Sequence, residues 1–219
     1  MLSTILELAL VVPAVLFAIT IHEYAHGWVA DRLGDPTARL MGRLTLNPLA
    51  HLDPIGALML VLVRIGWAKP VPVNPNNLRD PRRDMIWVSL AGPVTNLAAA
   101  LVLGTAVRLM VTYNVGLGPL TAPVLTLLVL GVVIDVALAI FNFLPIPPLD
   151  GSKVLAGLLP GRWAYQYLRF ERFGPIALIG LILAGQLFGI NVLGRLINPA
   201  IGFFVALFTG YPLQQFKML

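Results

Sequence analysis

Long apolar segments separated by short polar stretches dominate the pattern of this chain. They cover roughly residues 4–30, 54–67, 85–112, 121–145, 174–188 and 192–210. A helix needs about 20 residues to cross the ~30 Å hydrocarbon layer of a bilayer, and the first, third and fourth segments exceed that length. The last two are shorter and lie close together in the chain, so they predict a C-terminal helical hairpin over 174–210. The pattern therefore predicts several membrane-spanning helices.

Segment 54–67 is shorter than a normal span. As a helix it would extend only about 21 Å, at 1.5 Å per residue, and it contains Arg64. Basic residues flank it on both sides, and basic loops of membrane proteins tend to stay in the cytoplasm. We therefore expect this segment to enter the membrane and return on the same side. The alternative is that it crosses, which would give six spans instead of five.

The charges of the other loops predict the remaining topology. The loop over 113–120 carries no charge and suits the outside, whereas the loop over 146–173 is basic and suits the inside. The resulting topology places the N-terminus outside and the C-terminus inside. We expect an all-α polytopic membrane protein with five to six transmembrane helices and one re-entrant segment.

The composition agrees with this interpretation. Of the 219 residues, 58% are hydrophobic and only 11% are charged, against about 25% charged in soluble domains. No stretch is polar enough for a separate soluble module, so residues 1–219 form one membrane-embedded domain. Cysteine is absent, which excludes a thiolate metal site. The net charge is +5, but the sequence contains no run of basic and aromatic residues that would indicate nucleic-acid binding.

Two stretches predict extended backbone. Residues 39–47 end in partial alternation, and residues 70–77 contain three prolines, which exclude a helix. At membrane depth such backbone persists only where protein or a water-filled cavity satisfies it. We expect short β-hairpin-like elements there, beside a polar site.

The candidate chemistry centres on His22-Glu23-Tyr24-Ala25-His26. On a helix, positions 22 and 26 share one face, so both imidazoles can reach one zinc ion. Glu23 can then take a proton from the attacking water and pass it to the leaving amine. The alternative is a pair of interfacial histidines with a chance glutamate between them. Ionisable groups inside a span are costly and usually functional.

A catalytic zinc normally has three protein ligands, and the candidates for the third are Asp135 and Asp150. Asp150 follows a run of prolines after the 121–145 segment. These prolines break the helix and permit a carboxylate to turn back towards the site. The predicted topology brings Asp150 to the membrane depth of both histidines. The alternative for Asp150 is an ordinary turn aspartate before glycine.

Three motifs together resemble the site-2 protease family of intramembrane metalloproteases. They are the histidine motif, Ala91-Gly92-Pro93-Val94-Thr95-Asn96, and Asn142 followed by Pro145-Ile146-Pro147-Pro148-Leu149-Asp150-Gly151. The resemblance runs in order over residues 15–155, so we expect a catalytic core over about 4–155. No PDZ-like insertion or nucleotide-sensing domain is evident, which indicates a minimal form of the family.

The resemblance implies roles for individual residues. His22, His26 and Asp150 would bind one Zn²⁺ ion per chain, Glu23 would be the general base, and Asn142 would bind the scissile carbonyl or oxyanion. Residues 47–56 also resemble the family's segment after the first catalytic helix. The family cleaves membrane-spanning segments, so substrate helices and the lipid bilayer are the expected partners. We expect a prokaryotic cell membrane and a site that opens towards the cytoplasm.

Several polar residues have less specific signals. Asn47, His51 and Asn96 are candidate substrate-binding residues. His51 could also be a proton relay, a regulatory ligand or a loop histidine with a structural hydrogen bond, and Asn96 could join helices. Asp135 lies two turns before Asn142, and we expect it to form a structural ion pair, with Arg108 as the candidate partner, or to line a wet cavity.

Two other functions remain open from the sequence. A metal-ion transporter would explain intramembrane ligands but gives no reason for Glu23. A non-catalytic scaffold that binds membrane helices would not need Glu23 either. Intramembrane proteolysis of membrane-protein substrates is therefore the function that the sequence favours.

Overall fold

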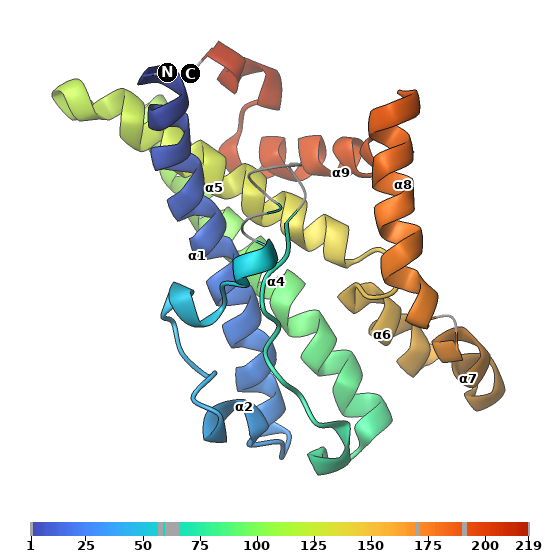
Figure 1. Cartoon of the computed structure of the whole chain (residues 1–219). Helices are drawn as coiled ribbons and strands as arrows, with labels where there is room; N and C mark the ends of the chain where they lie inside the picture. The colour runs from blue at the N-terminus through green and yellow to red at the C-terminus, as the bar shows by residue number, and fades with distance from the viewer. Residues whose placement is uncertain (1, 57–58, 60–65, 170, 190–191, 219) are drawn as a thin grey trace.

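The computed structural model of the chain describes residues 2–56, 59, 66–169, 171–189 and 192–218. Within these ranges the regular structure is helical (Figure 1). The helices are α1 (Leu2–Arg32), α2 (Thr37–Leu40), α4 (Pro81–Thr112), α5 (Thr121–Asn142), α6 (Asp150–Leu158), α7 (Gly161–Arg169), α8 (Gly174–Phe188) and α9 (Val192–Thr209). Short 3-10 turns cover Pro48–Ala50, Pro75–Asn77, Gly118–Leu120, Glu171–Phe173 and Leu213–Met218.

Four helices are long and apolar enough to cross a membrane. These candidate spans are Ala9–Arg32, Pro81–Thr112, Gly118–Asn142 and Val192–Thr209. The all-α class is confirmed for the described residues, whereas the predicted number of five to six spans is not. Most of segment 54–67, including Arg64, lies outside the described residues, so its re-entry stays a prediction.

The predicted β-hairpin-like elements are not confirmed. The described part of the chain holds an isolated antiparallel bridge between Leu52 and Ala68, and no β-strand is assigned within it. Residues 37–40 form the short helix α2 instead. Residues 66–74 are extended, as their prolines require, and they lie along α1 with the bridge to Leu52 as their strand-like pairing within the described residues. The end of the predicted extended stretch 70–77 differs, because Pro75–Asn77 form a 3-10 turn.

Helices α1, α4 and α5 pack against one another and carry the centre of the molecule (Figure 1). The start of α4 is capped on both sides of its first turn. Asp80 accepts a hydrogen bond from the Arg83 amide at 3.1 Å, and Asp84 accepts one from the Asp80 amide at 3.0 Å. Pro81 follows at the first helical position, where its missing N–H costs nothing. These contacts fix where α4 begins.

The apolar core lies where α9 packs onto α4 and α5. Its buried members are Ala100, Val132, Val136, Ile201 and Val205. Close contact depends on small residues, because a Cβ at Gly104 would lie 2.7 Å from the Cβ of Phe208. Helix α9 is therefore part of the bundle and not a peripheral hairpin arm.

The C-terminal part differs from the predicted topology. Helix α9 turns away from α8 and crosses towards the end of α4 (Figure 1), so the hairpin over 174–210 is not confirmed. The Tyr211 hydroxyl lies 3.5 Å from Thr112 Oγ1, and Gly210 lies against Arg108. The C-terminal segment thus lies beside the uncharged 113–120 loop, whereas the sequence placed it at the opposite end.

Candidate metal centre

His22 and His26 lie one turn apart on α1. Their rings meet edge to face, with centroids 4.6 Å apart and an interplanar angle of 83°. Both residues are buried, with 5% and 8% of their surface exposed. The helical spacing of the motif therefore gives the predicted result, two imidazoles on one face of a helix that packs against α4 and α5.

Asp150 reaches these histidines because the chain folds back after α5. The prolines at 145, 147 and 148 keep residues 143–149 out of a helix, and α6 starts at Asp150 itself. A Cβ at Gly151 would lie 2.3 Å from the Phe143 carbonyl oxygen. Only glycine permits this close return, and it aims the first carboxylate of α6 at α1.

One carboxylate oxygen faces both imidazoles. Asp150 Oδ2 lies 3.1 Å from His22 Nε2 and 3.2 Å from His26 Nε2. The three ligand atoms all lie within 4.8 Å of one another. His22 and Asp150 are 128 positions apart in the chain. Among the described residues, these three side chains form a group that could hold a metal ion.

The other nitrogen of each ring has a fixed partner. His22 Nδ1 lies 2.5 Å from Asn96 Oδ1, and His26 Nδ1 lies 2.7 Å from the Val88 carbonyl oxygen. Both partners only accept hydrogen bonds, so each Nδ1 carries the proton. Each Nε2 then directs its lone pair at the Asp150 carboxylate. This is the tautomer that a histidine uses when it binds a metal through Nε2.

These three groups fit a zinc ion. Two lone pairs and a carboxylate oxygen repel one another unless a cation, either a proton or a metal ion, lies between them. A tetrahedral zinc with donors at about 2.0–2.1 Å keeps those donors roughly 3.3 Å apart, close to the observed 3.1 and 3.2 Å. Nitrogen and carboxylate donors are also those that zinc prefers.

Gly92 on α4 leaves the space that this centre needs. A Cβ at this position would lie 2.5 Å from His26 Nε2 and 2.6 Å from His22 Nε2. Any other residue would press on the two atoms that would bind the metal. The Gly92 position within its motif is therefore explained by the metal centre as well as by close helix packing.

Glu23 points to the extended segment over 66–74. Its Oε2 accepts a hydrogen bond from the Val71 amide at 2.7 Å. The Val71 side chain is buried, and its Cγ1 would lie 3.0 Å from a Cβ at Gly27. The extended segment thus lies along the helix face that carries the glutamate.

Several bonds hold this segment in place. Arg43 Nη2 donates to the Lys69 carbonyl at 2.9 Å, and the Lys69 amide donates to the His51 carbonyl at 2.9 Å. Farther along, the Asn74 amide donates to Asp35 Oδ2 at 2.7 Å. The segment is therefore tied to the end of α1 and to the preceding loop.

Asp35 is the main anchor and is fully buried. It also accepts hydrogen bonds from Asn77 Nδ2 at 2.9 Å, from the Thr37 amide at 3.1 Å, and from the Thr37 hydroxyl. Burial by itself would raise the pKa of Asp35, but the bonds from Thr37, Asn77 and Asn74 outweigh it and hold the pKa below its usual range. The carboxylate is therefore ionised at neutral pH.

Three further predicted site residues, Asn142, Asn47 and His51, have hydrogen-bond partners outside the three metal-binding side chains. Asn142, at the end of α5, donates from Nδ2 to the Leu138 carbonyl of its own helix at 3.0 Å. Asn47 accepts from the Leu49 amide at 3.1 Å and begins the turn at Pro48–Ala50. His51 is fully buried, with Nε2 2.9 Å from the Thr45 carbonyl, which corresponds to its alternative as a structural loop histidine.

Asn96 and Asp135 lie in the interior beside His22. Asn96 Nδ2 donates to Asp135 Oδ1 at 2.6 Å and to the Ala18 carbonyl at 3.0 Å. Among the described residues no ion pair joins Asp135 to Arg108, and Arg108 lies against Gly210 instead. The expected ion pair is therefore wrong, because Asp135 faces α1 and α4 through Asn96.

Sequence reasoning missed the backbone groups of the site. The Val88 carbonyl and the Val71 amide bear no side-chain signal, so no motif could have indicated them. Asp35 was also missed, although its position between Gly34 and Pro36 is typical of a turn with backbone-binding aspartate.

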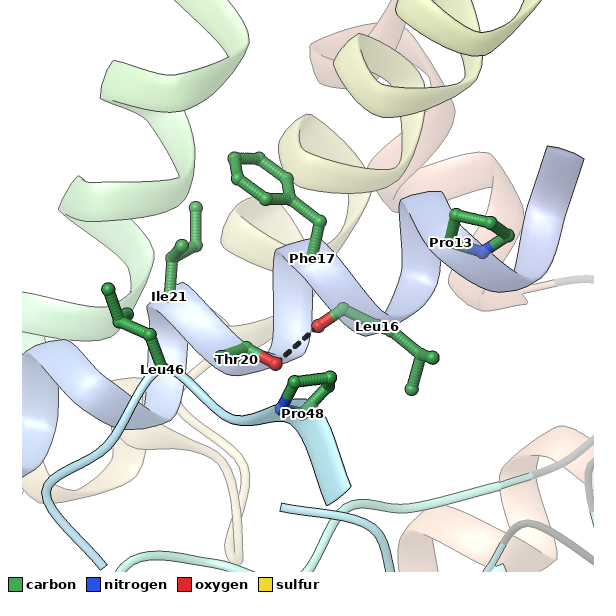
Figure 2. A pocket seen from close by; sticks show the side chains of 7 residues that line it. All are labelled: Pro13, Leu16, Phe17, Thr20, Ile21, Leu46 and Pro48. Atoms are coloured by element: carbon green, nitrogen blue, oxygen red, sulfur yellow. Dashed lines mark hydrogen bonds between the residues drawn. The ribbon is translucent and has the colours of Figure 1, made fainter. Parts of the chain in front are cut away.

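An apolar groove lies along α1, and one of its lining residues, Ile21, directly precedes His22 in the chain (Figure 2). It has a volume of about 440 Å³ and lies between α1 and the stretch around Leu46 and Pro48. The α1 residues that line it are Pro13, Leu16, Phe17, Thr20 and Ile21. The Thr20 hydroxyl donates to the Leu16 carbonyl at 2.6 Å, so the groove presents a largely apolar wall.

Comparison with known proteins identifies relatives. "Putative zinc metalloprotease YwhC" of Bacillus subtilis (strain 168) is 35% identical over 193 residues, which are 88% of this chain and 87% of that protein. "Putative zinc metalloprotease Rip2" of Mycobacterium tuberculosis (strain ATCC 25618 / H37Rv) is 31% identical over 186 residues, 82% of this chain and 69% of that protein. The chain belongs to this family of zinc metalloproteases.

A third relative extends this comparison. "Putative zinc metalloprotease Rip2" of Mycolicibacterium smegmatis (strain ATCC 700084 / mc(2)155) is 31% identical over 151 residues, 67% of this chain and 56% of that protein. No family model matches the chain, and no solved structure matches it. Membership of a zinc metalloprotease family implies a zinc cofactor, and the His22, His26 and Asp150 group is able to hold one.

Proposed function

We propose that this metalloprotease is an intramembrane enzyme of the site-2 protease type, which cleaves peptide bonds within or near transmembrane segments. The observation that carries the proposal is the position of the metal centre. Two of its three side chains belong to α1, whose Ala9–Arg32 part is apolar and long enough to span a bilayer. A metal centre buried against such a helix suits a substrate that is itself embedded in the membrane.

The chemistry divides between the ion and the chain. When bound, zinc acts as a Lewis acid that polarises the scissile carbonyl and makes water more acidic. His22, His26 and Asp150 would hold it, and Gly92 keeps their inner face clear. Glu23 is the proposed general base. It follows His22 directly, and its carboxylate takes the proton of the attacking water and returns it to the leaving amine.

The extended segment over 66–74 supports a role in positioning substrate. Backbone at the edge of such a segment can pair with an extended peptide, which would then lie beside Glu23. Asn142 remains a proposed ligand of the scissile carbonyl, for which its amide must leave the Leu138 carbonyl. Asn47, near the groove, remains a candidate contact with substrate.

The proposed substrates are single membrane-spanning segments of other proteins. A regular helix encloses its carbonyls in backbone hydrogen bonds, so it must unwind locally before attack. We therefore expect Gly, Pro or Asn residues near the cleaved bond to favour cutting, because they weaken a helix. The apolar groove of Figure 2 would receive such a segment beside α1.

We further propose a multi-pass protein of a prokaryotic membrane, with its site open to the cytoplasm. Basic residues gather where α1 ends, where α4 begins and in the 146–173 loop, including Arg32, Arg82, Arg83 and Arg162. Such a distribution favours the cytoplasm for this end of the bundle. The named relatives belong to bacteria, which supports the prokaryotic assignment.

The test is cleavage of a single-span substrate by the purified chain in liposomes. We expect Glu23→Gln to abolish cutting while zinc stays bound, because the base is lost and the three ligands are kept. Asp150→Ala should abolish both cutting and zinc binding. Glu171→Gln, the same change at an exposed glutamate, should cut like the wild type.

Robust cutting by Glu23→Gln would overturn the proposal. The same liposomes separate the protease from a metal-ion carrier. A protease retains one zinc ion per chain, whereas a carrier moves zinc into the lumen and does so without Glu23. Zinc uptake at a rate that the Glu23→Gln substitution leaves unchanged, without cutting, would favour transport.

A further inference from the structure

The amide of Asn96 forms hydrogen bonds within the bundle through its oxygen and through its nitrogen. Its oxygen faces His22 Nδ1 at 2.5 Å, and its nitrogen donates to Asp135 Oδ1 at 2.6 Å and to the Ala18 carbonyl at 3.0 Å. Asn96 is fully buried. An amide has two N–H groups to donate, and here both have acceptors.

These contacts determine which way the amide faces. In the flipped orientation its oxygen would meet Asp135 Oδ1 and the Ala18 carbonyl, and all three are acceptors. Its NH₂ group would then face His22 Nδ1 and require a lone pair there. The His22 proton would move to Nε2, the atom that faces Asp150, and a protonated Nε2 cannot bind a metal.

Asp135 supplies the shorter of the two contacts that prevent this flip. It lies fully buried on α5, and Oδ2 has no hydrogen-bond partner among the described protein atoms. A buried carboxyl group is costly, and among the described residues the hydrogen bond of this carboxyl group is the one from Asn96. A purely apolar residue would suit the neighbouring core of Val132 and Val136 better.

We propose that Asp135 is a positioning residue for the proposed zinc ligand His22 and that it acts through Asn96. The carboxylate holds the Asn96 amide, the amide oxygen holds the proton of His22 on Nδ1, and Nε2 stays free to bind zinc. The hydrogen bonds between Asp135 and Asn96 and between Asn96 and His22 thus connect α5, α4 and α1. The inference rests on the proposed zinc site but does not depend on what the enzyme cleaves.

The test measures zinc affinity of the full chain in lipid nanodiscs by competition with a zinc-binding dye. Outer partners of metal ligands typically change affinity by about 10–100-fold. Asp135 lies one residue beyond such a partner, so we expect Asp135→Leu and Asp135→Ala to weaken zinc binding about tenfold. Asp135→Asn retains an acceptor oxygen and should restore most of the affinity. The smaller Asp135→Ala keeps the test valid if Asp135→Leu does not fold.

Val132→Ala is the matched control on α5. It removes buried apolar atoms one turn from Asp135 and makes no polar contact. It should lower the melting temperature of the metal-free protein and leave zinc affinity unchanged, so it separates packing from positioning. Wild-type affinity in Asp135→Leu and Asp135→Ala would overturn the inference, as would an Asp135→Asn variant as weak as these two.

A second measurement reads the tautomer directly. The chain has only 3 histidines, so ¹⁵N NMR of histidine-labelled metal-free protein can follow His22 individually. We expect a protonated Nδ1 in the wild type and a larger share of protonated Nε2 in Asp135→Ala. An unchanged tautomer would overturn the inference. If the wild type binds no zinc at all, the proposed function itself is wrong. That result is distinct from a failure of the Asp135 inference, in which the wild type binds zinc and the Asp135 variants bind it equally well.

Discussion

The absence of a side chain at position 92 creates the space in which the metal centre forms. In the sequence, Gly92 appears only as a member of the motif Ala91–Asn96, and the structure shows what lies opposite it. The two Nε2 atoms of the histidine motif lie 2.5 and 2.6 Å from the position that a Cβ would take. Glycine therefore has a chemical role at this position besides its role in packing.

We predict that Gly92→Ala prevents zinc binding. The added methyl group would lie 2.5 Å from His26 Nε2, and it would have to displace one imidazole. Metal content of the purified protein, measured by elemental analysis, should fall from one zinc per chain to near zero. Cleavage should be lost with it.

Gly202→Ala is the matched control for this prediction. Gly202 lies in α9, and a Cβ there meets nothing within 4 Å. Alanine favours a helix over glycine by about 1 kcal/mol, so this variant should be at least as stable as the wild type and bind zinc fully. A zinc-loaded Gly92→Ala enzyme would contradict the proposed placement of the metal.

At the scale of elements, the extended segment over 66–74 is the least regular part of the site. Its prolines exclude an α-helix, and within the described residues its strand-like pairing is limited to the bridge between Ala68 and Leu52. Its place on α1 therefore depends mainly on individual polar bonds. Asp35 supplies several of these at one end, and Arg43 supplies another near the middle. The segment is therefore ordered by charged side chains more than by backbone pairing.

We predict that Asp35→Asn lowers the stability of the folded chain by about 2 kcal/mol at pH 7, the size of hydrogen bonds to a charged group. The asparagine side chain has an NH₂ group in place of one carboxylate oxygen. That group is a donor, so it repels the N–H groups of Thr37, Asn74 or Asn77 that now donate to Asp35. The pKa of Asp35 is lowered in the folded state. Its stabilisation is therefore complete above the usual aspartate pKa and is lost as the pH falls through the lowered value.

Thermal unfolding in detergent at pH 7, 5 and 3 checks this prediction. The difference in melting temperature between wild type and Asp35→Asn should be largest at pH 7 and should shrink at pH 3. Asp31→Asn is the control, because Asp31 pairs with the largely exposed Arg39, and exposed pairs contribute about 0–1 kcal/mol. Equal effects of both substitutions would contradict the anchoring role of Asp35.

For the whole molecule, the structure changes the predicted topology at the C-terminal end. Gly157 of α6 packs against Ile86 near the start of α4, whereas the Tyr211 hydroxyl reaches Thr112 at the end of α4. These two points on α4 are roughly 39 Å apart at 1.5 Å per residue. The 146–173 loop and the C-terminal segment therefore lie at opposite ends of the bundle.

We predict that single cysteines report this arrangement in intact cells. The chain has no cysteine of its own, so each variant carries one thiol. Gly116→Cys and Gln214→Cys should react together with a membrane-impermeant maleimide added outside. Gln166→Cys should react only after the membrane is opened. Labelling of Gln214→Cys together with Gln166→Cys would restore the topology that the sequence predicted.

The sequence by itself determined the local chemistry. Spacing places His22 and His26 on one helix face because an α-helix repeats every 3.6 residues. The prolines before Asp150 and in 70–74 excluded an α-helix there because proline lacks an N–H, although Pro75–Asn77 form a 3-10 turn. The apolar segments gave the long helices. Each of these results follows from residues that are neighbours in the chain.

Only the tertiary structure decided how distant residues combine. Asp150 instead of Asp135 completes the cluster because Gly151 permits the chain to fold back against Phe143. Asp135 turns to Asn96 and not to Arg108, and Glu23 binds a backbone amide of the extended segment. Backbone donors and acceptors are the same in every residue, so their partners depend on packing, and the sequence pattern carries no signal for them.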